Sequence, residues 1–364
     1  MMEDTNTNNI PEKEQKISPQ APIYVTTKNP PLYYAPIADD PKLKLKKELR
    51  SVANKACSGV LLLYVCGVLF QIAITILAFI FMSKGEVIYN EFLGFINTPT
   101  FNLLFNSFYQ AIFMTLPFIV AGVISKQRPS DILCYSKPKN IIPLSILGLG
   151  GAMLCNLANI IIHFVFSLFG STLKGSNLEM NCDMGSFFLN IITVAVIPAL
   201  FEEFAFRGML MGLLRKRFST SASIIISAAA FGLIHGNFVQ IPFAFLIGLI
   251  LGYLYAATGS LWVPMLVHFL NNAYSIVIDH ITYNMPTSAS NIVFYTSLCI
   301  LLLSGIIAFI YIIKTNPETL NYNDNKKDFS NPEMLKIGFT SPVFIISAVF
   351  FLIDAVTNQI GGVI

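Results

Sequence analysis

Long runs of residues without charge are the feature that most constrains this fold. Residues 58–82, 101–125 and 141–169 contain no Asp, Glu, Lys or Arg. Each run reaches the roughly 20 residues that an α-helix needs to cross about 30 Å of hydrocarbon. Only helices and closed barrels satisfy their backbone hydrogen bonds in lipid, and continuous apolar runs lack the alternating pattern of barrel strands. The sequence therefore predicts an all-α integral membrane protein.

Six more apolar runs follow and predict a polytopic bundle of about eight to nine transmembrane helices. They are residues 187–208, 220–235, 238–257, 261–278, 291–313 and 342–354. The last has only about a dozen apolar residues and is the weakest candidate for a span. The composition agrees, because 12% of the 364 residues are charged, whereas roughly 25% are charged in a soluble domain.

The basic residues predict an orientation. With the amino terminus in the cytosol, all but Lys84 and Lys174 of the 23 Lys and Arg residues fall towards the cytosolic side, as the positive-inside rule requires. A basic cluster lies just before the first span and consists of Lys42, Lys44, Lys46, Lys47 and Arg50. Such a cluster sets the topology or contacts anionic lipid. We expect no nucleic-acid partner, because no nucleic-acid-binding fold accompanies the charge. The expected location is a multi-pass position in the lipid bilayer, the plasma membrane if the source is bacterial.

Polar side chains inside the spans are energetically costly and are candidates for function. The ionisable ones, with the two asparagines that follow His268, are Glu202, Glu203, Arg207, His235, His268, Asn271 and Asn272, and His163 stands alone in the third run. Glu203 precedes Arg207 by four residues, so the two share a helix face and can form an ion pair. Glu202 is turned by about 100° from Glu203 and points elsewhere. One glutamate is therefore expected to be structural and the other available for chemistry.

Residue counting predicts that the polar groups of three helices meet. Glu202 and His235 lie roughly 24–26 Å from the turn at residues 214–218, on antiparallel neighbours. His268 lies about 13 Å along a helix that starts on the cytosolic side, and Asn272 shares its face. An unpaired carboxylate beside a neutral imidazole can act as a general base. Amide and imidazole donors can stabilise developing negative charge.

Each polar group also has a purely structural interpretation. Glu203 and Arg207 can be a buried ion pair that sets helix register, and this holds even within an active enzyme. His235 and His268 can form hydrogen bonds between helices. Their shared depth with the carboxylate of Glu202 is what favours a functional site.

The spacing of these residues resembles three motifs of the CPBP intramembrane proteases. This family includes CAAX prenyl endopeptidases, bacteriocin-processing and immunity proteins, and abortive-infection-like (Abi) proteins. The matching residues are Glu202, Glu203 and Arg207 for E-E-x-x-x-R, Phe231 and His235 for F-x-x-x-H, and His268 and Asn272 for H-x-x-x-N. The resemblance covers residues 187–279, and the other helices match only as hydrophobic segments.

The resemblance implies an active site in the core of the bundle. Glu202 and His235 would activate a water for attack on a peptide carbonyl. His268 and Asn272 would stabilise the oxyanion. The ion pair of the first motif would hold the geometry of the site.

A metal site is the alternative chemistry. Two His and two Glu could bind zinc with a catalytic water. The sequence has no H-E-x-x-H motif. Glu203 is expected to pair with Arg207, which leaves Glu202, His235 and His268 as possible zinc ligands. Metal-independent hydrolysis is favoured, and zinc stays an alternative cofactor.

The predicted function is an intramembrane endopeptidase that cuts a peptide or membrane-associated protein near the cytosolic face. One alternative is a non-catalytic bacteriocin-immunity or peptide-binding membrane protein on the same scaffold. Another is a transporter that relays protons through carboxylates, but the chain lacks the repeated broken-helix halves of many transporters.

Four regions organise the chain in this interpretation. They are a cytosolic, largely disordered tail (1–57), the first three transmembrane helices (58–186), a catalytic core of four helices (187–280), and C-terminal helices with a cytosolic loop (281–364).

Overall fold

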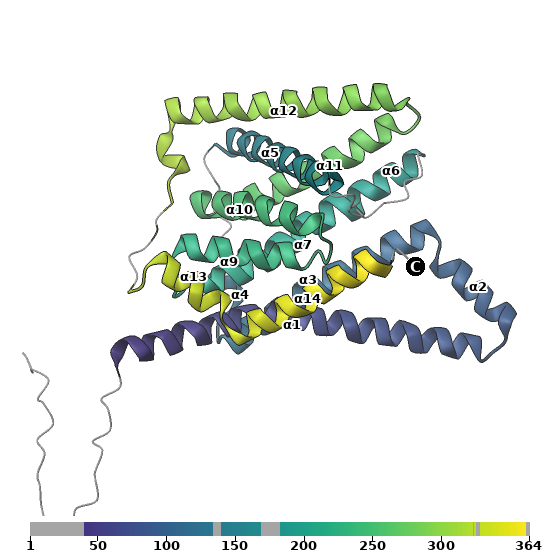
Figure 1. Ribbon diagram of the computed structural model, residues 1–364, viewed down its shortest axis with the longest axis horizontal. Coiled ribbons are helices and arrows are strands. Elements are labelled where there is room, and N and C mark those ends of the chain that lie inside the picture. The colour runs from purple at the N-terminus through teal and green to yellow at the C-terminus, as the bar shows by residue number, and fades with distance from the viewer. Residues whose placement is uncertain (1–39, 134–139, 169–182, 323, 325–327, 362–364) are drawn as a thin grey trace, which may run out of the picture. The chain divides into compact units, whose positions relative to one another are not determined.

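A computed structural model describes residues 40–133, 140–168, 183–322, 324 and 328–361 of the chain, and these residues are overwhelmingly helical (Figure 1). In chain order the elements are α1 (Pro41–Met82), α2 (Glu86–Ile96), α3 (Pro99–Ile124), α4 (Pro129–Ile132), α5 (Ile141–Leu168), α6 (Met184–Asn190), η1 (Ile191–Val196), α7 (Ile197–Glu203), η2 (Phe204–Met211), α8 (Gly212–Arg215), α9 (Thr220–Leu233), α10 (Gln240–Thr258), α11 (Trp262–Thr282), α12 (Thr287–Thr315), η3 (Pro317–Leu320), α13 (Asn331–Phe339) and α14 (Pro342–Gly361). The predicted all-α membrane architecture is confirmed.

Seven helical segments of the described chain are long and apolar enough to cross a membrane. They are Pro41–Met82, Pro99–Ile124, Ile141–Ile162, Met184–Arg215, Gln240–Thr258, Thr287–Thr315 and Pro342–Gln359. The weakest predicted span therefore has the length it needs, because α14 continues beyond Asp354.

Two other predicted spans differ from expectation. Helix α9 has only 14 residues, a length of about 21 Å, which is shorter than the hydrocarbon layer. Helix α11 has 21 residues but falls outside the seven apolar segments. Its polar residues include His268 and Asn272, which line an internal cavity.

The first helix begins earlier than the predicted end of the tail at residue 57. Residues 1–39 lie outside the described chain, but residues 41–57 belong to α1. Leu49, Ala53 and Ala56 recur at helical spacing and are buried in the core. That apolar stripe stabilises a helix that begins before the uncharged run.

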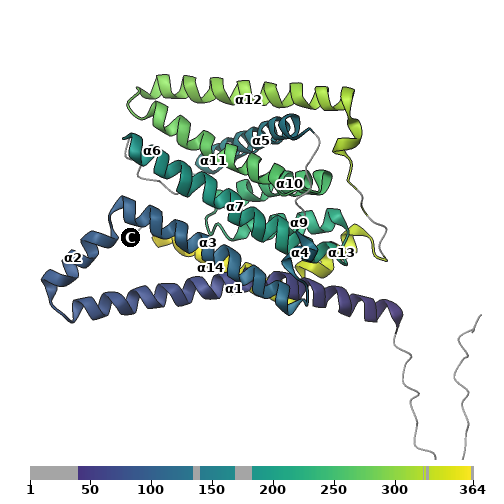
Figure 2. The same cartoon turned by 180° about the vertical axis from the view of Figure 1, so that it is seen from behind.

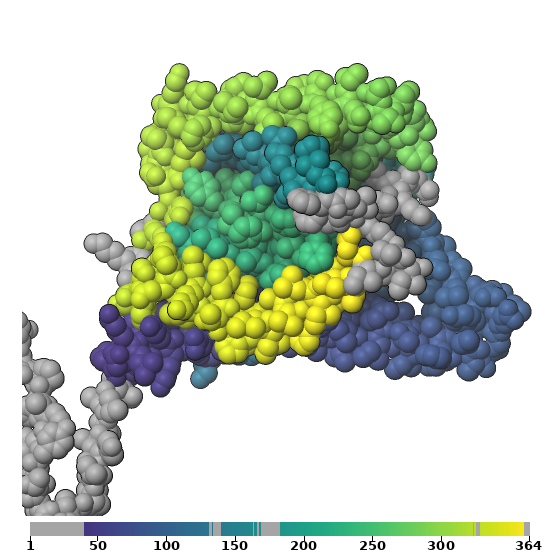
Figure 3. Space-filling view, viewed as in Figure 1, coloured from purple at the N-terminus to yellow at the C-terminus, as the bar shows by residue number. Residues whose placement is uncertain are grey.

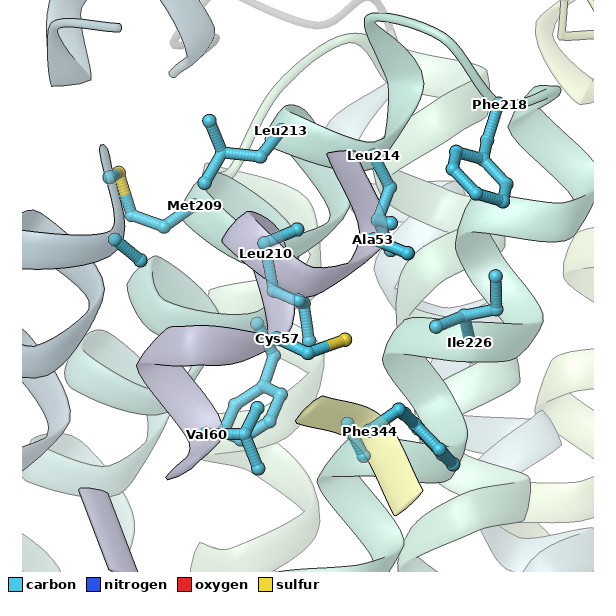
Figure 4. Close-up of a cluster of buried hydrophobic side chains, with 14 of the residues drawn as sticks. Ala53, Cys57, Val60, Met209, Leu210, Leu213, Leu214, Phe218, Ile226 and Phe344 are labelled. Carbon is cyan, nitrogen blue, oxygen red and sulfur yellow. The ribbon is translucent and has the colours of Figure 1, made fainter. Parts of the chain in front are cut away.

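One hydrophobic cluster joins α1 and α14 to the central helices (Figure 4). Cys57 and Val60 of α1 pack in it with Leu210 of η2, Ile226 of α9 and Phe344 of α14. Figure 3 shows α14, in yellow, lying beside α1 on the face that is drawn. The first and last helices are thereby packed against the helices that carry the candidate site.

The segment Met184–Arg215 is one long helix with two π-helical stretches, at Ile191–Val196 and Phe204–Met211. These stretches flank α7, which carries Glu202 and Glu203 near its end. π-Bulges inside α-helices occur frequently at functional sites. The prediction placed the end of this span at residue 208, and the helix continues to Arg215.

Two glycines allow α5 and α12 to pack closely, an arrangement that both ribbon views show (Figures 1 and 2). A Cβ atom at Gly305 would lie 2.8 Å from the Gly150 Cα. We expect Gly305→Leu to force the helices apart and to lower stability by about 1–3 kcal/mol, the usual effect of overpacking. Thermal unfolding of the purified protein measures this.

The matched control is Gly94→Leu in α2, because a Cβ atom there would meet nothing within 4 Å. Equal melting temperatures for Gly305→Leu and the control would contradict the close contact.

Candidate active site

A cavity of about 380 Å³ lies between α3, the long helix, α9, α10 and α11. All four predicted catalytic side chains line it: Glu202, His235, His268 and Asn272. Among the described residues, no Lys or Arg lines the cavity. The ionisable groups that line the cavity are therefore carboxylates and imidazoles, set among apolar side chains.

The early end of α9 creates this space. Its last residue is Leu233 and α10 begins at Gln240. The turn between them is sharp because Gly236 has a φ of +53°, which glycine adopts without steric cost. Asn237 stabilises the turn, since its Oδ1 accepts a 2.8 Å hydrogen bond from the Val239 N–H.

The C-terminal helix also holds this turn. The Asn358 side-chain amide of α14 donates a 2.9 Å hydrogen bond to the Gly236 carbonyl. The neighbouring residue in the turn is His235. The helix that was hardest to predict therefore supports the position of a candidate catalytic residue.

The predicted ion pair is present and has a third member. Arg207 Nη1 donates to Glu203 Oε1 at 2.8 Å, and both side chains are almost completely buried. The same oxygen lies 2.8 Å from His268 Nδ1. Glu203 therefore orients an imidazole that lines the cavity, in addition to pairing with the arginine.

Phe231 packs at the centre of these groups. The Arg207 guanidinium lies 4.3 Å from the centroid of its ring. The rings of His235 and His268 pack edge-on against it, at centroid distances of 5.0 and 6.0 Å. The phenylalanine that precedes His235 by four residues thus sets the spacing of both imidazoles.

No ion pair joins Glu202 to Arg207, as expected, but Glu202 has another partner. Gln110 Nε2 of α3 donates a 2.5 Å hydrogen bond to Glu202 Oε1. Its other oxygen, Oε2, lies 3.8 Å from His268 Nε2. The prediction that Glu202 is unpaired is therefore wrong in one respect: an amide from a helix outside the three motifs holds it in place.

The hydrogen bonds of both imidazoles indicate which nitrogen faces the cavity. His235 Nδ1 lies 2.8 Å from the Phe231 carbonyl, which can only accept, so Nδ1 carries the hydrogen. His268 Nδ1 has the same role towards the Glu203 carboxylate. In a neutral imidazole one nitrogen donates and the other accepts. Nε2 of each neutral ring is therefore a proton acceptor.

Asn272 lies in the cavity wall and is anchored there. Its Nδ2 donates a 3.0 Å hydrogen bond to the carbonyl of Val194, which belongs to the first π-helical stretch. Its Oδ1 accepts from Asn271 Nδ2 at 3.2 Å. A carboxamide has two N–H donors, so one remains for a ligand.

Sequence reasoning missed several polar lining residues, among them Asn106 and Gln110 of α3 and Asp279 of α11. The two amides are four residues apart in an apolar helix and share a face. This amide pair is a signal that the sequence carries, although neither side chain is ionisable.

The alternative zinc site stays a prediction. The described residues contain no group of three or more His, Cys, Asp or Glu side chains arranged to hold an ion. Nδ1 of both imidazoles is engaged, and Glu202 Oε1 is engaged by Gln110.

The cavity extends from the middle of the bundle towards the helix ends that carry few basic residues. Its lining comes from the first half of α3, residues 193–202 of the long helix, the end of α9, the start of α10 and residues 268–279 of α11. The basic residues at the other ends of these or neighbouring helices are Lys126, Arg128, Arg215, Lys216, Arg217 and Lys314. The cytosolic position of the amino terminus and cleavage near the cytosolic face both stay predictions.

Residues 184–274 match the family described as "Type II CAAX prenyl endopeptidase Rce1-like". The "Putative membrane peptidase YdiL" of Bacillus subtilis (strain 168) is 26% identical over 91 residues, which cover 25% of this chain and 37% of the relative. The "Membrane-embedded CAAX protease MroQ" of Staphylococcus aureus (strain USA300) is 29% identical over 146 residues, 38% of this chain and 58% of the relative. The chain thus spans less than two thirds of the length of either. No solved structure matches it.

Proposed function

Because residues 184–274 carry the Rce1-like core of the CPBP membrane protease family, we propose that this chain is an intramembrane endopeptidase of the glutamate type. The observation that supports this most directly is the arrangement of Glu202 and the two histidines. All three line one cavity within the membrane bundle, and hydrogen bonds at Nδ1 leave each Nε2 able to accept a proton.

In the proposed reaction, Glu202 is the general base. It takes a proton from a water while the water oxygen bonds to the peptide carbonyl carbon, and His235 Nε2 accepts a hydrogen bond from the same water. Glu202 then returns the proton to the amide nitrogen as the C–N bond breaks. Such a positioned base contributes a factor of about 10²–10⁴ in rate.

The oxyanion is stabilised from α11. The free N–H of Asn272 donates to it, and so does His268 Nε2 when that imidazole is protonated. The Glu203 carboxylate, 2.8 Å from His268 Nδ1, orients that ring towards the oxyanion. Donors fixed in a site that excludes bulk water stabilise developing charge strongly.

We propose that hydrolysis needs no metal. The expected result is that purified protein in nanodiscs cleaves a peptide library at the same rate with and without 1,10-phenanthroline. Loss of cleavage that added zinc restores would instead assign Glu202, His235 and His268 as zinc ligands.

We further propose that the amino terminus is cytosolic and that the substrate reaches the cavity from the outer half of the membrane. This follows from the position of the cavity opposite the basic helix ends, which the positive-inside rule assigns to the cytosol. Substrates would then be peptides or membrane proteins accessible from that side.

Cysteine labelling tests this orientation. A membrane-impermeant maleimide added to intact cells should modify Ser275→Cys, an exposed position in the cavity wall, and should spare Arg217→Cys at the basic turn. Peptide mass spectrometry identifies the labelled residue among the native cysteines. After permeabilisation both should react, and the reverse pattern in intact cells would exclude outer access.

A further inference from the structure

A second carboxylate lines the cavity at the end far from the proposed reaction centre. Asp279 lies on α11, eleven residues after His268. At 1.5 Å per residue the two are roughly 16 Å apart along the helix. An extended peptide advances about 3.3 Å per residue, so this distance corresponds to about five residues of bound peptide.

The wall between these two ends is suited to an extended backbone. His268, Asn272, Ser275 and Asp279 follow one another at spacings of three or four residues, and all line the cavity. They therefore occupy one face of α11. Asn106 of α3 also lines it. These side chains offer hydrogen bonds to the peptide groups that an extended segment carries into the membrane bundle.

Asp279 has no structural role that the described contacts explain. No hydrogen bond or ion pair joins its side chain to any other described residue. It lies in the last turn of α11, which ends at Thr282. A carboxylate there faces the negative end of the helix dipole, which is unfavourable. A side chain that weakens its own helix and faces a cavity without Lys or Arg is suited to binding a cation.

We propose that Asp279 is a specificity-determining residue that binds a cationic group of the substrate, a Lys or Arg side chain about five residues from the scissile bond. The cavity would then favour an internal basic segment over a free C-terminal carboxylate. The inference rests on the proposed function insofar as the cavity binds a peptide.

Binding can be measured without turnover. Protein carrying Glu202→Gln is immobilised in nanodiscs and incubated with a randomised decapeptide library, and the bound peptides are sequenced. We expect severalfold enrichment of Lys and Arg. Adding Asp279→Asn should remove the enrichment, and adding Asp279→Lys should shift it to Asp and Glu. A merely structural role for Asp279 would not reverse the charge preference.

The matched control is Glu91→Gln in α2, an exposed carboxylate outside the cavity, which should retain the enrichment. Equal enrichment with and without Asp279, or none at all, would overturn the inference. Cleavage of the same library by protein with intact Glu202 reports separately on the protease. Cleavage without a preference for Lys or Arg would contradict only the proposed role of Asp279. Binding that depends on Asp279 without any cleavage would contradict only the proposed protease activity.

Discussion

Replacing Glu202 with Gln is expected to lower the rate of peptide cleavage by a factor on the order of 10²–10⁴, the usual contribution of a positioned base. The substitution keeps the size of the side chain and removes its ability to accept a proton from water. Gln110 can still donate to the remaining side-chain oxygen, so the local hydrogen bond with α3 survives. The measurement is the cleavage rate of a peptide library by purified protein in nanodiscs.

Two comparisons separate a chemical effect from a structural one. Thermal unfolding should be nearly unchanged in Glu202→Gln, because the substituted side chain occupies the same space. Glu91→Gln, an exposed carboxylate outside the cavity, should cleave at the wild-type rate. Wild-type cleavage by Glu202→Gln would falsify the proposed mechanism.

The same variant discriminates between a protease and a binding protein in cells. A peptide-binding or immunity protein would keep its protective effect with Glu202→Gln, since binding does not need a base. A proton-coupled transporter would lose uptake in proteoliposomes. An endopeptidase would leave an uncut substrate to accumulate, which a comparison of membrane peptides from both strains would detect.

The second large effect is expected at the ion pair of the long helix. Arg207→Met leaves the completely buried Glu203 carboxylate without its guanidinium. Removing one partner of a buried ion pair lowers the free energy of unfolding by about 3–5 kcal/mol, because the other charge stays buried and unpaired. Thermal or denaturant unfolding of the purified protein measures the change.

The double variant Glu203→Leu/Arg207→Met separates stability from function. Removing both charges should recover much of the stability, because apolar replacements of a buried pair are often neutral or stabilising. Cleavage should stay low, since His268 Nδ1 has lost the carboxylate that orients it. A double variant that regains both properties would show that Glu203 has no role beyond the ion pair.

Much of the site could be predicted because its groups follow local spacing rules. Glu203 and Arg207 are one helical turn apart, and the structure pairs them. Glu202 and His235 were placed at matching depth by counting from one turn, and they line the same cavity. Such predictions need only the rise and period of a helix.

The contact between Gln110 and Glu202 could not be predicted in the same way. Gln110 and Glu202 lie 92 residues apart in the sequence. A different rotation of α3 about its axis would place the Gln110 side chain away from Glu202. The contact exists because α3 packs against the long helix at one specific rotation. The hydrogen bond from Asn358 to Gly236 has the same origin in the packing of α14.

The sequence by itself determined the membrane class, the helices and the polar residues that each helix carries. Charge is excluded from runs long enough to cross lipid, and helical periodicity assigns side chains to faces. Only the tertiary structure decided that a cavity lies beyond the end of α9, and that Asp279 lines it. Those outcomes depend on how helices distant in the sequence pack together, which local hydrophobicity does not specify.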